Sequence, residues 1–131
     1  MIARTLVAIG LSACTASAAL AYGDLDGNHL LKACNDALAD WKTLDADGQV
    51  LVGYCAGIIH GVAGTHRGAT AAPGNPANAA FCLPDSMTIH DGARAVVKYL
   101  NEHPERLQDE ATDLVSAAFG NAFPCKQKDT Q

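Results

Sequence analysis

The sequence predicts an all-α domain of four helices, arranged as two antiparallel hairpins that are each closed by a disulfide bond. Apolar residues recur at spacings of three and four along four segments, and no segment of useful length alternates like a β-strand. The four cysteines that follow the N-terminal segment form two pairs, each centred on a turn-like stretch, 43–48 or 103–104. Two helices that reverse at such a turn bring the paired residues level. We therefore predict two bridges, Cys34–Cys55 and Cys82–Cys125.

Loop length alone does not select this pairing. In a chain-entropy treatment, loops of these sizes contribute ~3 to 4 kcal/mol each, and the alternative pairing lies within about 1 kcal/mol. That alternative joins Cys55 to Cys82 and Cys34 to Cys125. The prediction therefore depends on the hairpin geometry, which must bring bridged Cα atoms within roughly 7 Å. An even set of cysteines also indicates an oxidising compartment.

The first predicted helix runs from about His29 to Trp41, with Asn28 as its N-cap. Leu30, Leu31 and Cys34 begin its apolar stripe.

The second predicted helix runs from about Gly48 to Val62, with Asp47 as its N-cap. It carries Gly53, Gly57 and Gly61 at four-residue intervals, and each glycine costs up to about 1 kcal/mol of helix propensity relative to alanine. We therefore expect a neighbouring helix to approach closely at this row. On that interpretation, Gly57→Leu would overpack the contact at a cost of roughly 1–3 kcal/mol.

Residues 65–80 lack a helical period and are rich in small residues, glycine and proline. This composition predicts a long internal loop between the second and third helices. Loops of this kind are either functional or merely mobile, and both alternatives stay open.

The third predicted helix opens at Thr88, with Asp91 completing a weak capping box, and ends near Asn101. Pro104 suits the first turn of a fourth helix. The fourth helix continues to about Phe119, where the following glycine is a natural stop.

The first 21 residues have the layout of a secretory signal, which leaves residues 22–131 as one helical domain. Arg4 provides the positive region, an apolar stretch follows, and Ala19-Leu20-Ala21 fits the small-x-small cleavage rule. The apolar run is too short for a membrane span. A second interpretation takes the residues up to Cys14 as a lipoprotein signal, but soluble export to the periplasm or the medium fits the layout better.

Charge and motif content exclude several classes of function. The formal net charge is −5, and removal of Arg4 makes it more negative, which argues against nucleic acid or an anionic membrane as partner. The five histidines include no pair at the spacing of a helical zinc site, and neither acidic Gly-containing stretch fits a calcium loop. Paired cysteines leave no thiolate nucleophile. We therefore predict a protein without cofactor or metal that is not an enzyme.

Five segments, in this order, resemble the Rap/Tai family. They are Gly27 to Leu31 followed by Cys34, Cys55 to Val62, Phe81 to Pro84, Val96 to Glu105, and Ala122 to Cys125. Characterised members of that family are small exported helical proteins. They are immunity proteins that bind and block peptidoglycan amidases delivered by type VI secretion. The resemblance implies an inhibitor that fills the cleft of such an amidase, and a homodimer is compatible with it.

Two exposed elements are candidates for the contact with that partner. One is the turn that contains Glu102, His103, Glu105 and Arg106, where Pro104 limits flexibility. The other is the predicted loop around His66 and Arg67. The alternative function is a periplasmic helper or acid-stress protein without a toxin target, in which protonation of histidines or carboxylates would loosen a dimer.

Overall fold

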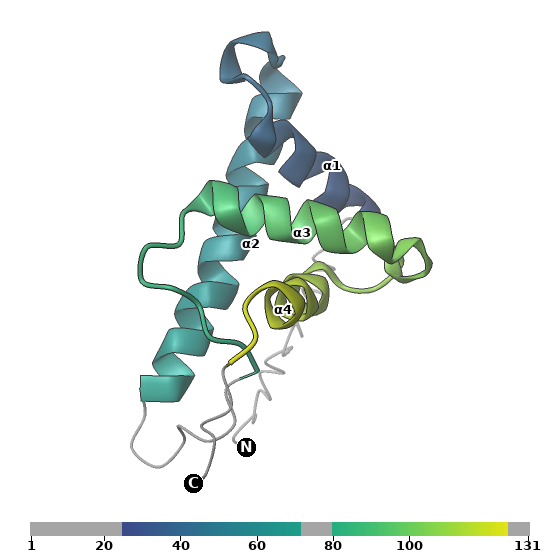
Figure 1. The fold of residues 1–131 in the computed structure, drawn as a ribbon. Coiled ribbons are helices and arrows are strands. Elements are labelled where there is room, and N and C mark those ends of the chain that lie inside the picture. Colours follow the sequence, from purple (N-terminus) through teal and green to yellow (C-terminus); the bar gives the residue numbers. More distant parts are fainter. Residues whose placement is uncertain (1–24, 72–79, 126–131) are drawn as a thin grey trace, which may run out of the picture.

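The computed structural model describes residues 25–71 and 80–125, and within these ranges it confirms the all-α fold class (Figure 1). The predicted signal segment 1–21, Cys14 and residues 72–79 lie outside the described residues. The described elements comprise four α-helices and two short 3₁₀ helices: α1 (Gly27–Leu38), η1 (Trp41–Thr43), α2 (Ala46–Ala71), α3 (Ile89–Glu102), η2 (Pro104–Arg106) and α4 (Ala111–Ala122).

Helix α1 begins two residues earlier than predicted because Asp26, and not Asn28, caps it. The Asp26 carboxylate accepts a hydrogen bond from the backbone N–H of His29 at 3.0 Å. The side-chain amide of Asn28 instead donates to the carbonyl of Leu107 at 3.1 Å, which ties α1 to the segment before α4. The helix ends at Leu38, so the prediction that Trp41 continues its apolar stripe was wrong: Trp41 lies in η1 with 54% of its surface exposed.

Helix α2 is much longer than predicted. The N–H of Gly48 donates to Asp45 Oδ1 at 2.8 Å, so the first turn is held by Asp45 and not by Asp47. At the other end the helix continues to Ala71, so the prediction of a loop beginning at residue 65 was wrong. Thr65 and Thr70 donate their hydroxyls to carbonyls of the preceding turn, which keeps these side chains compatible with a helix. Contact between this last part of α2 and residue 81 outweighs the weak local propensity.

No helix of the described residues packs against the glycine row of α2. A Cβ atom built at Gly53, Gly57 or Gly61 meets no atom of the described residues within 4 Å, so the predicted close contact was wrong. Close approach occurs at two other glycines. A Cβ at Gly27 would lie 2.7 Å from Leu114 Cδ1 and 2.9 Å from the Cα of Leu107, and one at Gly92 would lie 2.9 Å from Ile59 Cγ2.

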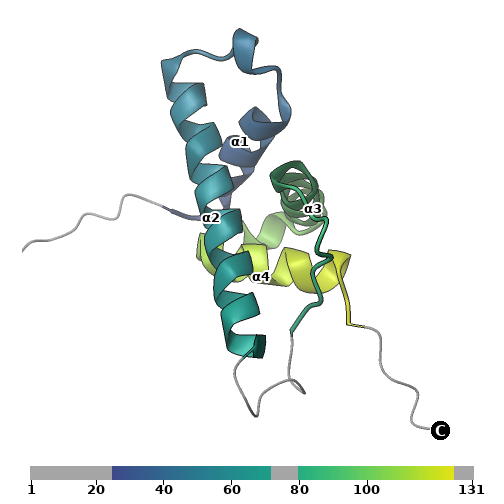
Figure 2. The same cartoon turned by 90° about the vertical axis from the view of Figure 1, so that its left-hand side faces the viewer.

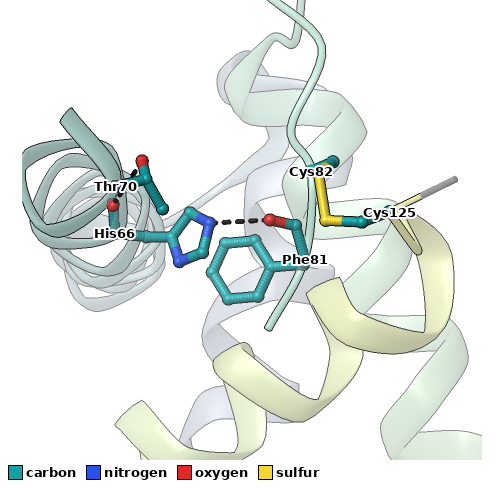
Figure 3. The surroundings of a disulfide bond; sticks show 5 residues. All are labelled: His66, Thr70, Phe81, Cys82 and Cys125. Atoms are coloured by element: carbon teal, nitrogen blue, oxygen red, sulfur yellow. Dashed lines mark hydrogen bonds between the residues drawn. A yellow bond between two sulfur atoms is a disulfide. The ribbon is translucent and has the colours of Figure 1, made fainter. Parts of the chain in front are cut away.

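Both predicted disulfides are present, with Cα atoms 5.1 Å apart in Cys34–Cys55 and 4.8 Å apart in Cys82–Cys125. The first joins α1 to α2, and both of its cysteines are fully buried. The second joins the segment before α3 to the segment after α4, and Cys82 is exposed (Figure 3). The N–H of Cys82 also donates to the carbonyl of Phe123 at 2.8 Å. The second bridge therefore joins the two segments that flank the α3–α4 unit, and neither of its cysteines lies in a helix.

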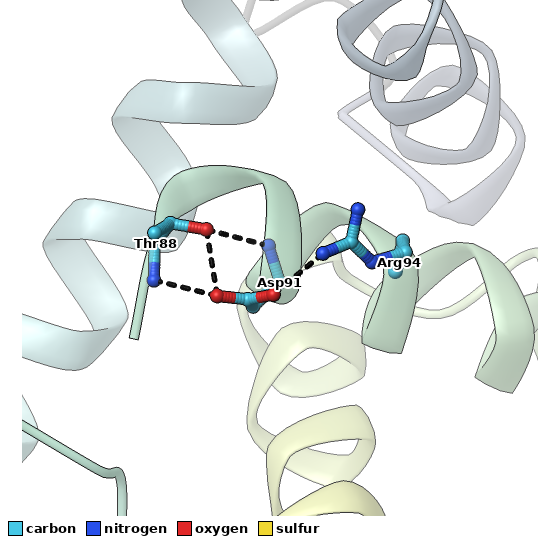
Figure 4. A network of polar contacts seen from close by, with 3 residues as sticks. All are labelled: Thr88, Asp91 and Arg94. Atoms are coloured by element: carbon cyan, nitrogen blue, oxygen red, sulfur yellow. Dashed lines mark hydrogen bonds and ion pairs between the residues drawn. The ribbon is translucent and has the colours of Figure 1, made fainter. Parts of the chain in front are cut away.

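The capping box at the start of α3 is confirmed (Figure 4). Thr88 Oγ1 accepts from the N–H of Asp91 at 3.2 Å, while the Asp91 carboxylate accepts from the N–H and the hydroxyl of Thr88. Arg94 adds an ion pair to the same carboxylate at 2.6 Å.

The predicted fourth helix is divided in two. Pro104 opens only the 3₁₀ turn η2, and α4 begins at Ala111. The start of α4 is bonded to the segment before α1: the N–H of Ala111 donates to the carbonyl of Leu25 at 3.0 Å, and Asp26 forms an isolated bridge with Glu110. These long-range bonds replace the local ones that a continuous helix would make.

The core lies where α1, α3 and α4 meet one side of α2. Figures 1 and 2 together show α4 crossing α3, with α2 running past both and extending beyond them. The largest fully buried side chains of the described residues form one cluster: Phe119, Leu30, Ile59, Leu100, Leu114, Val96, Val115, Cys34 and Cys55.

Candidate functional site

The first predicted contact element, residues 102–106, forms the turn between α3 and α4 and is called the tip below (Figure 1). Glu102 and Glu105 are both exposed. Lys98 donates to Glu102, and the ring of His103 lies with its Nδ1 3.0 Å from Glu105 Oε1. A hydrogen bond from its own backbone N–H, then the contact with His103, holds the pKa of Glu105 below its ordinary value. The tip therefore presents two carboxylates to solvent.

Arg106 belongs to the internal structure of the tip. Its Nε donates to Asp109 Oδ2 at 2.7 Å, and its Nη1 donates to the hydroxyl of Tyr99 at 2.6 Å. The hydrogen bond to Asp109, and then the one to Tyr99, raises the pKa of the guanidinium above its ordinary value. The side chain is thus held against α3, and the exposed groups of the tip are the acidic ones.

The second predicted element lies on the last turns of α2. His66 stacks on Phe81 with ring centroids 3.8 Å apart, and its Nε2 lies 2.6 Å from the carbonyl oxygen of Phe81 (Figure 3). This contact holds the segment that carries Cys82 against α2. Arg67 is exposed, and within residues 25–71 and 80–125 its guanidinium has no ion-pair partner.

The structure does not bring the two predicted elements together, but two adjoining hollows lie along α2 and α4. A hollow of about 810 Å³ is lined by Asp109, the ion-pair partner of Arg106 in the tip, and a hollow of about 490 Å³ is lined by His66. Ile58 and Thr112 line both hollows, so the two lie side by side. We call this surface the α2/α4 groove, and its principal lining residues are Gly53, Tyr54, Gly57, Ile58, Gly61, Thr65 and His66 on α2 and Glu110, Ala111, Thr112 and Ser116 around α4.

One end of the α2/α4 groove is acidic. Asp26, Asp109 and Glu110 line it. The N–H of His29, then the amide of Asn28, lowers the pKa of Asp26 from its ordinary value, so this carboxylate is charged at neutral pH. Asp109 is paired with Arg106, whereas Glu110 makes no side-chain capping bond to α4. A partner would therefore find negative charge at this end.

Tyr54 lies beside the acidic end with an unusual environment. Among the described residues it carries the buried side-chain oxygen that has no hydrogen-bond partner. Burial, and then the charge of Asp26, raises the pKa of its hydroxyl, so Tyr54 stays protonated and able to donate. Its ring contacts His29 edge-on at a centroid distance of 4.9 Å. An unpaired buried hydroxyl of this kind costs about 1–3 kcal/mol.

Sequence reasoning missed the groove although its signal was visible. The row of Gly53, Gly57 and Gly61 was taken as a contact within the chain, but these residues form the exposed border of the groove. Periodicity identifies a face without large side chains, and it does not say whether the neighbour of that face belongs to the same molecule.

In the described part of the chain, no three His, Cys, Asp or Glu side chains are grouped so that they could hold a metal ion. None of the helices described has both the length and the apolar character needed to span a bilayer.

Comparison with known proteins gives one match. A family model described as Rap1a immunity proteins matches residues 26–125. No curated protein and no solved structure matches the chain. The matched range begins at the cap of α1 and ends at Cys125, so it includes all four helices, both disulfides and all the lining residues of the α2/α4 groove except Leu25.

Proposed function

The chain belongs to the family of Rap1a immunity proteins, and we propose that it is an exported immunity protein that binds a peptidoglycan amidase and blocks its active-site cleft. Family membership indicates a protein effector as the partner. The observation that carries the proposal is the extent of the match, which covers every described helix and not one isolated motif.

The architecture suits inhibition by occlusion. A plug must keep its shape while it enters a cleft, because flexibility lost on binding weakens the complex. The tip is fixed at both ends by α3 and by the Arg106–Asp109 ion pair, and it exposes Glu102 and Glu105. We propose these two carboxylates as the groups that enter the cleft, with Arg67 as the second candidate contact.

The compartment follows from the same proposal. Peptidoglycan amidases act outside the cytoplasmic membrane, so an inhibitor must be exported to meet them. The signal-like residues 1–21 and two disulfides in a small helical domain support a periplasmic location. Intact mass of the periplasmic protein tests this, with a start at Tyr22 expected and a lipid-modified Cys14 as the contrary result.

The direct test uses the purified mature protein and a peptidoglycan amidase encoded beside its gene. Calorimetry should show a complex, and the protein should stop release of peptide fragments from purified peptidoglycan. Replacing Glu102 and Glu105 together by alanine should weaken binding at least tenfold, equivalent to about 1.4 kcal/mol, whereas circular dichroism stays unchanged. Arg67→Ala provides the parallel measurement on the other element.

Absence of both binding and inhibition for the unmodified protein would overturn the immunity function. The helper or acid-stress alternative would then be tested by protection of an unfolded client protein at low pH. Sedimentation of the same preparation measures whether the protein is a homodimer, which stays a prediction.

A further inference from the structure

We propose that the α2/α4 groove is the surface on which a helix of the effector docks, with a lysine or arginine of that helix at the acidic end. This inference rests on the proposed immunity function and adds the contact surface and the chemistry of the partner segment. Four observations carry it: the open glycine border, the length of the groove, its charge, and its position beside the tip.

Within residues 25–71 and 80–125, no side chain or backbone packs against the glycine border. Gly53, Gly57 and Gly61 are exposed, and a Cβ at any of them would meet open space. Alanine would make a more stable helix at each of these positions. Small residues on a helix surface allow another backbone to approach to the short end of the usual interaxial range, about 8 Å. Glycine at these positions therefore leaves room for a helix of another protein to pack closely against α2.

The dimensions of the groove favour a helix as the occupant. Its lining on α2 extends from Gly53 to Ala69, which at about 1.5 Å per residue gives a length near 24 Å. That length accommodates roughly four turns of a second helix. An added β-strand is excluded at this wall, because α2 is a continuous helix whose backbone groups bond within the helix.

The negative charge at one end of the groove favours a basic residue of the partner at that position. Glu110 is exposed, and its carboxylate accepts a hydrogen bond from the hydroxyl of Thr112 at 3.2 Å. The nearby Asp26 carboxylate carries a second negative charge. A lysine or arginine placed here would pair with Glu110 and lie close to the charge of Asp26.

The groove also adjoins the element proposed to enter the amidase cleft. Asp109 lines the acidic end and forms the ion pair with Arg106 of the tip. One partner could therefore receive the tip in its cleft while a helix at the rim of that cleft lies along α2. The two contacts would form one continuous interface.

The test fills the groove without disturbing the fold. Gly57→Leu places a large side chain in the first hollow, and His90→Leu is the control, because His90 is an exposed residue of α3 that does not line the groove. We expect Gly57→Leu to weaken binding of the neighbouring amidase by at least about tenfold, as measured by calorimetry. His90→Leu should bind like the unmodified protein, and circular dichroism should show native helix content in both.

Two further variants test the acidic end. Glu110→Lys should weaken the same binding by about tenfold and reduce its dependence on salt, whereas Asp85→Lys, an exposed charge reversal outside the groove, should not.

Unchanged amidase binding by folded Gly57→Leu would overturn the inference, while binding by the unmodified protein would leave the immunity function intact. If Gly57→Leu changed only the sedimentation of the free protein, the groove would be a surface for self-association and the inference would equally fail. Failure of the unmodified protein to bind any amidase would remove the proposed function, and the inference with it.

Discussion

The two faces of α2 differ in burial and in the size of their side chains, although both belong to the same helix of 26 residues. One face buries Cys55 and Ile59 completely and Ala63 almost completely against the rest of the domain. The other face carries exposed glycines with open space around them. The first face stabilises the fold through its buried side chains. The second face contributes little to stability, so a binding partner can contact it without disturbing the core. The comparison predicts opposite responses to substitution on the two faces.

The largest effect is expected on the core face. Ile59→Ala should lower the free energy of unfolding by about 2–5 kcal/mol, because it leaves a cavity at a fully buried site. Urea denaturation followed by circular dichroism measures this. Val50→Ala on the same helix is the control, since Val50 is 72% exposed and its loss should change stability by less than about 0.5 kcal/mol. Equal effects of the two substitutions would contradict the division of α2 into two faces.

A smaller loss is expected where the structure, and not the sequence, places close glycine contacts. Gly27→Ala should cost roughly 1–3 kcal/mol, because the new Cβ would lie 2.9 Å from the Cα of Leu107 and backbone must move. Gly53→Ala is the control, with nothing within 4 Å of its Cβ. A Gly27→Ala variant as stable as the unmodified protein would mean that α1 and the segment before α4 are further apart than described.

A gain is expected on the outward face. Gly57→Ala should raise the free energy of unfolding by up to about 1 kcal/mol, because alanine favours the helix and its Cβ enters open space. Thermal melts of the free protein measure this gain. Destabilisation would restore the original interpretation, in which the glycine row packs against a helix of the same chain.

The smallest effect concerns acid. The hydrogen bonds from Thr88, followed by the contact with Arg94, lower the pKa of Asp91 from its ordinary value of 3.8 to about 2. A carboxyl with a lowered folded-state pKa stabilises the fold fully above its unfolded-state pKa, and this contribution is lost as the pH falls from near 4 toward 2. Asp91→Asn should therefore flatten the decrease in melting temperature across that interval. Asp113→Asn, at an acid in the first turn of α4, should retain the normal decrease.

The sequence predicted the parts of this fold that depend on local periodicity and on distances between cysteines. The four helices, both bridges and the capping box at Thr88 follow from such signals. The division of the fourth helix does not, because the hydrogen bond from Ala111 to Leu25 joins residues that are far apart in sequence. The extension of α2 likewise depends on the stacking of His66 on Phe81.

The candidate site shows the same limit of local reasoning. The tip was found because a proline and several charged residues adjoin in sequence, but the internal role of Arg106 is set by Tyr99 and Asp109. The groove was missed because its two walls, α2 and α4, are separated by the whole of α3. Hydrophobic periodicity predicts each of these two helices, whereas the space between them depends on how the helices pack in the folded protein.

The exposure of Trp41 determines how this protein can be observed by optical spectroscopy. It is the single tryptophan of the chain, and it lies in η1 between α1 and α2 with 54% of its surface in contact with solvent. Its emission should already resemble that of a hydrated indole in the native state and should change little when the core melts. The same residue is a local reporter for that turn, because a ligand that covers it would shift the emission to shorter wavelength. Fluorescence would then map which end of the molecule a partner touches.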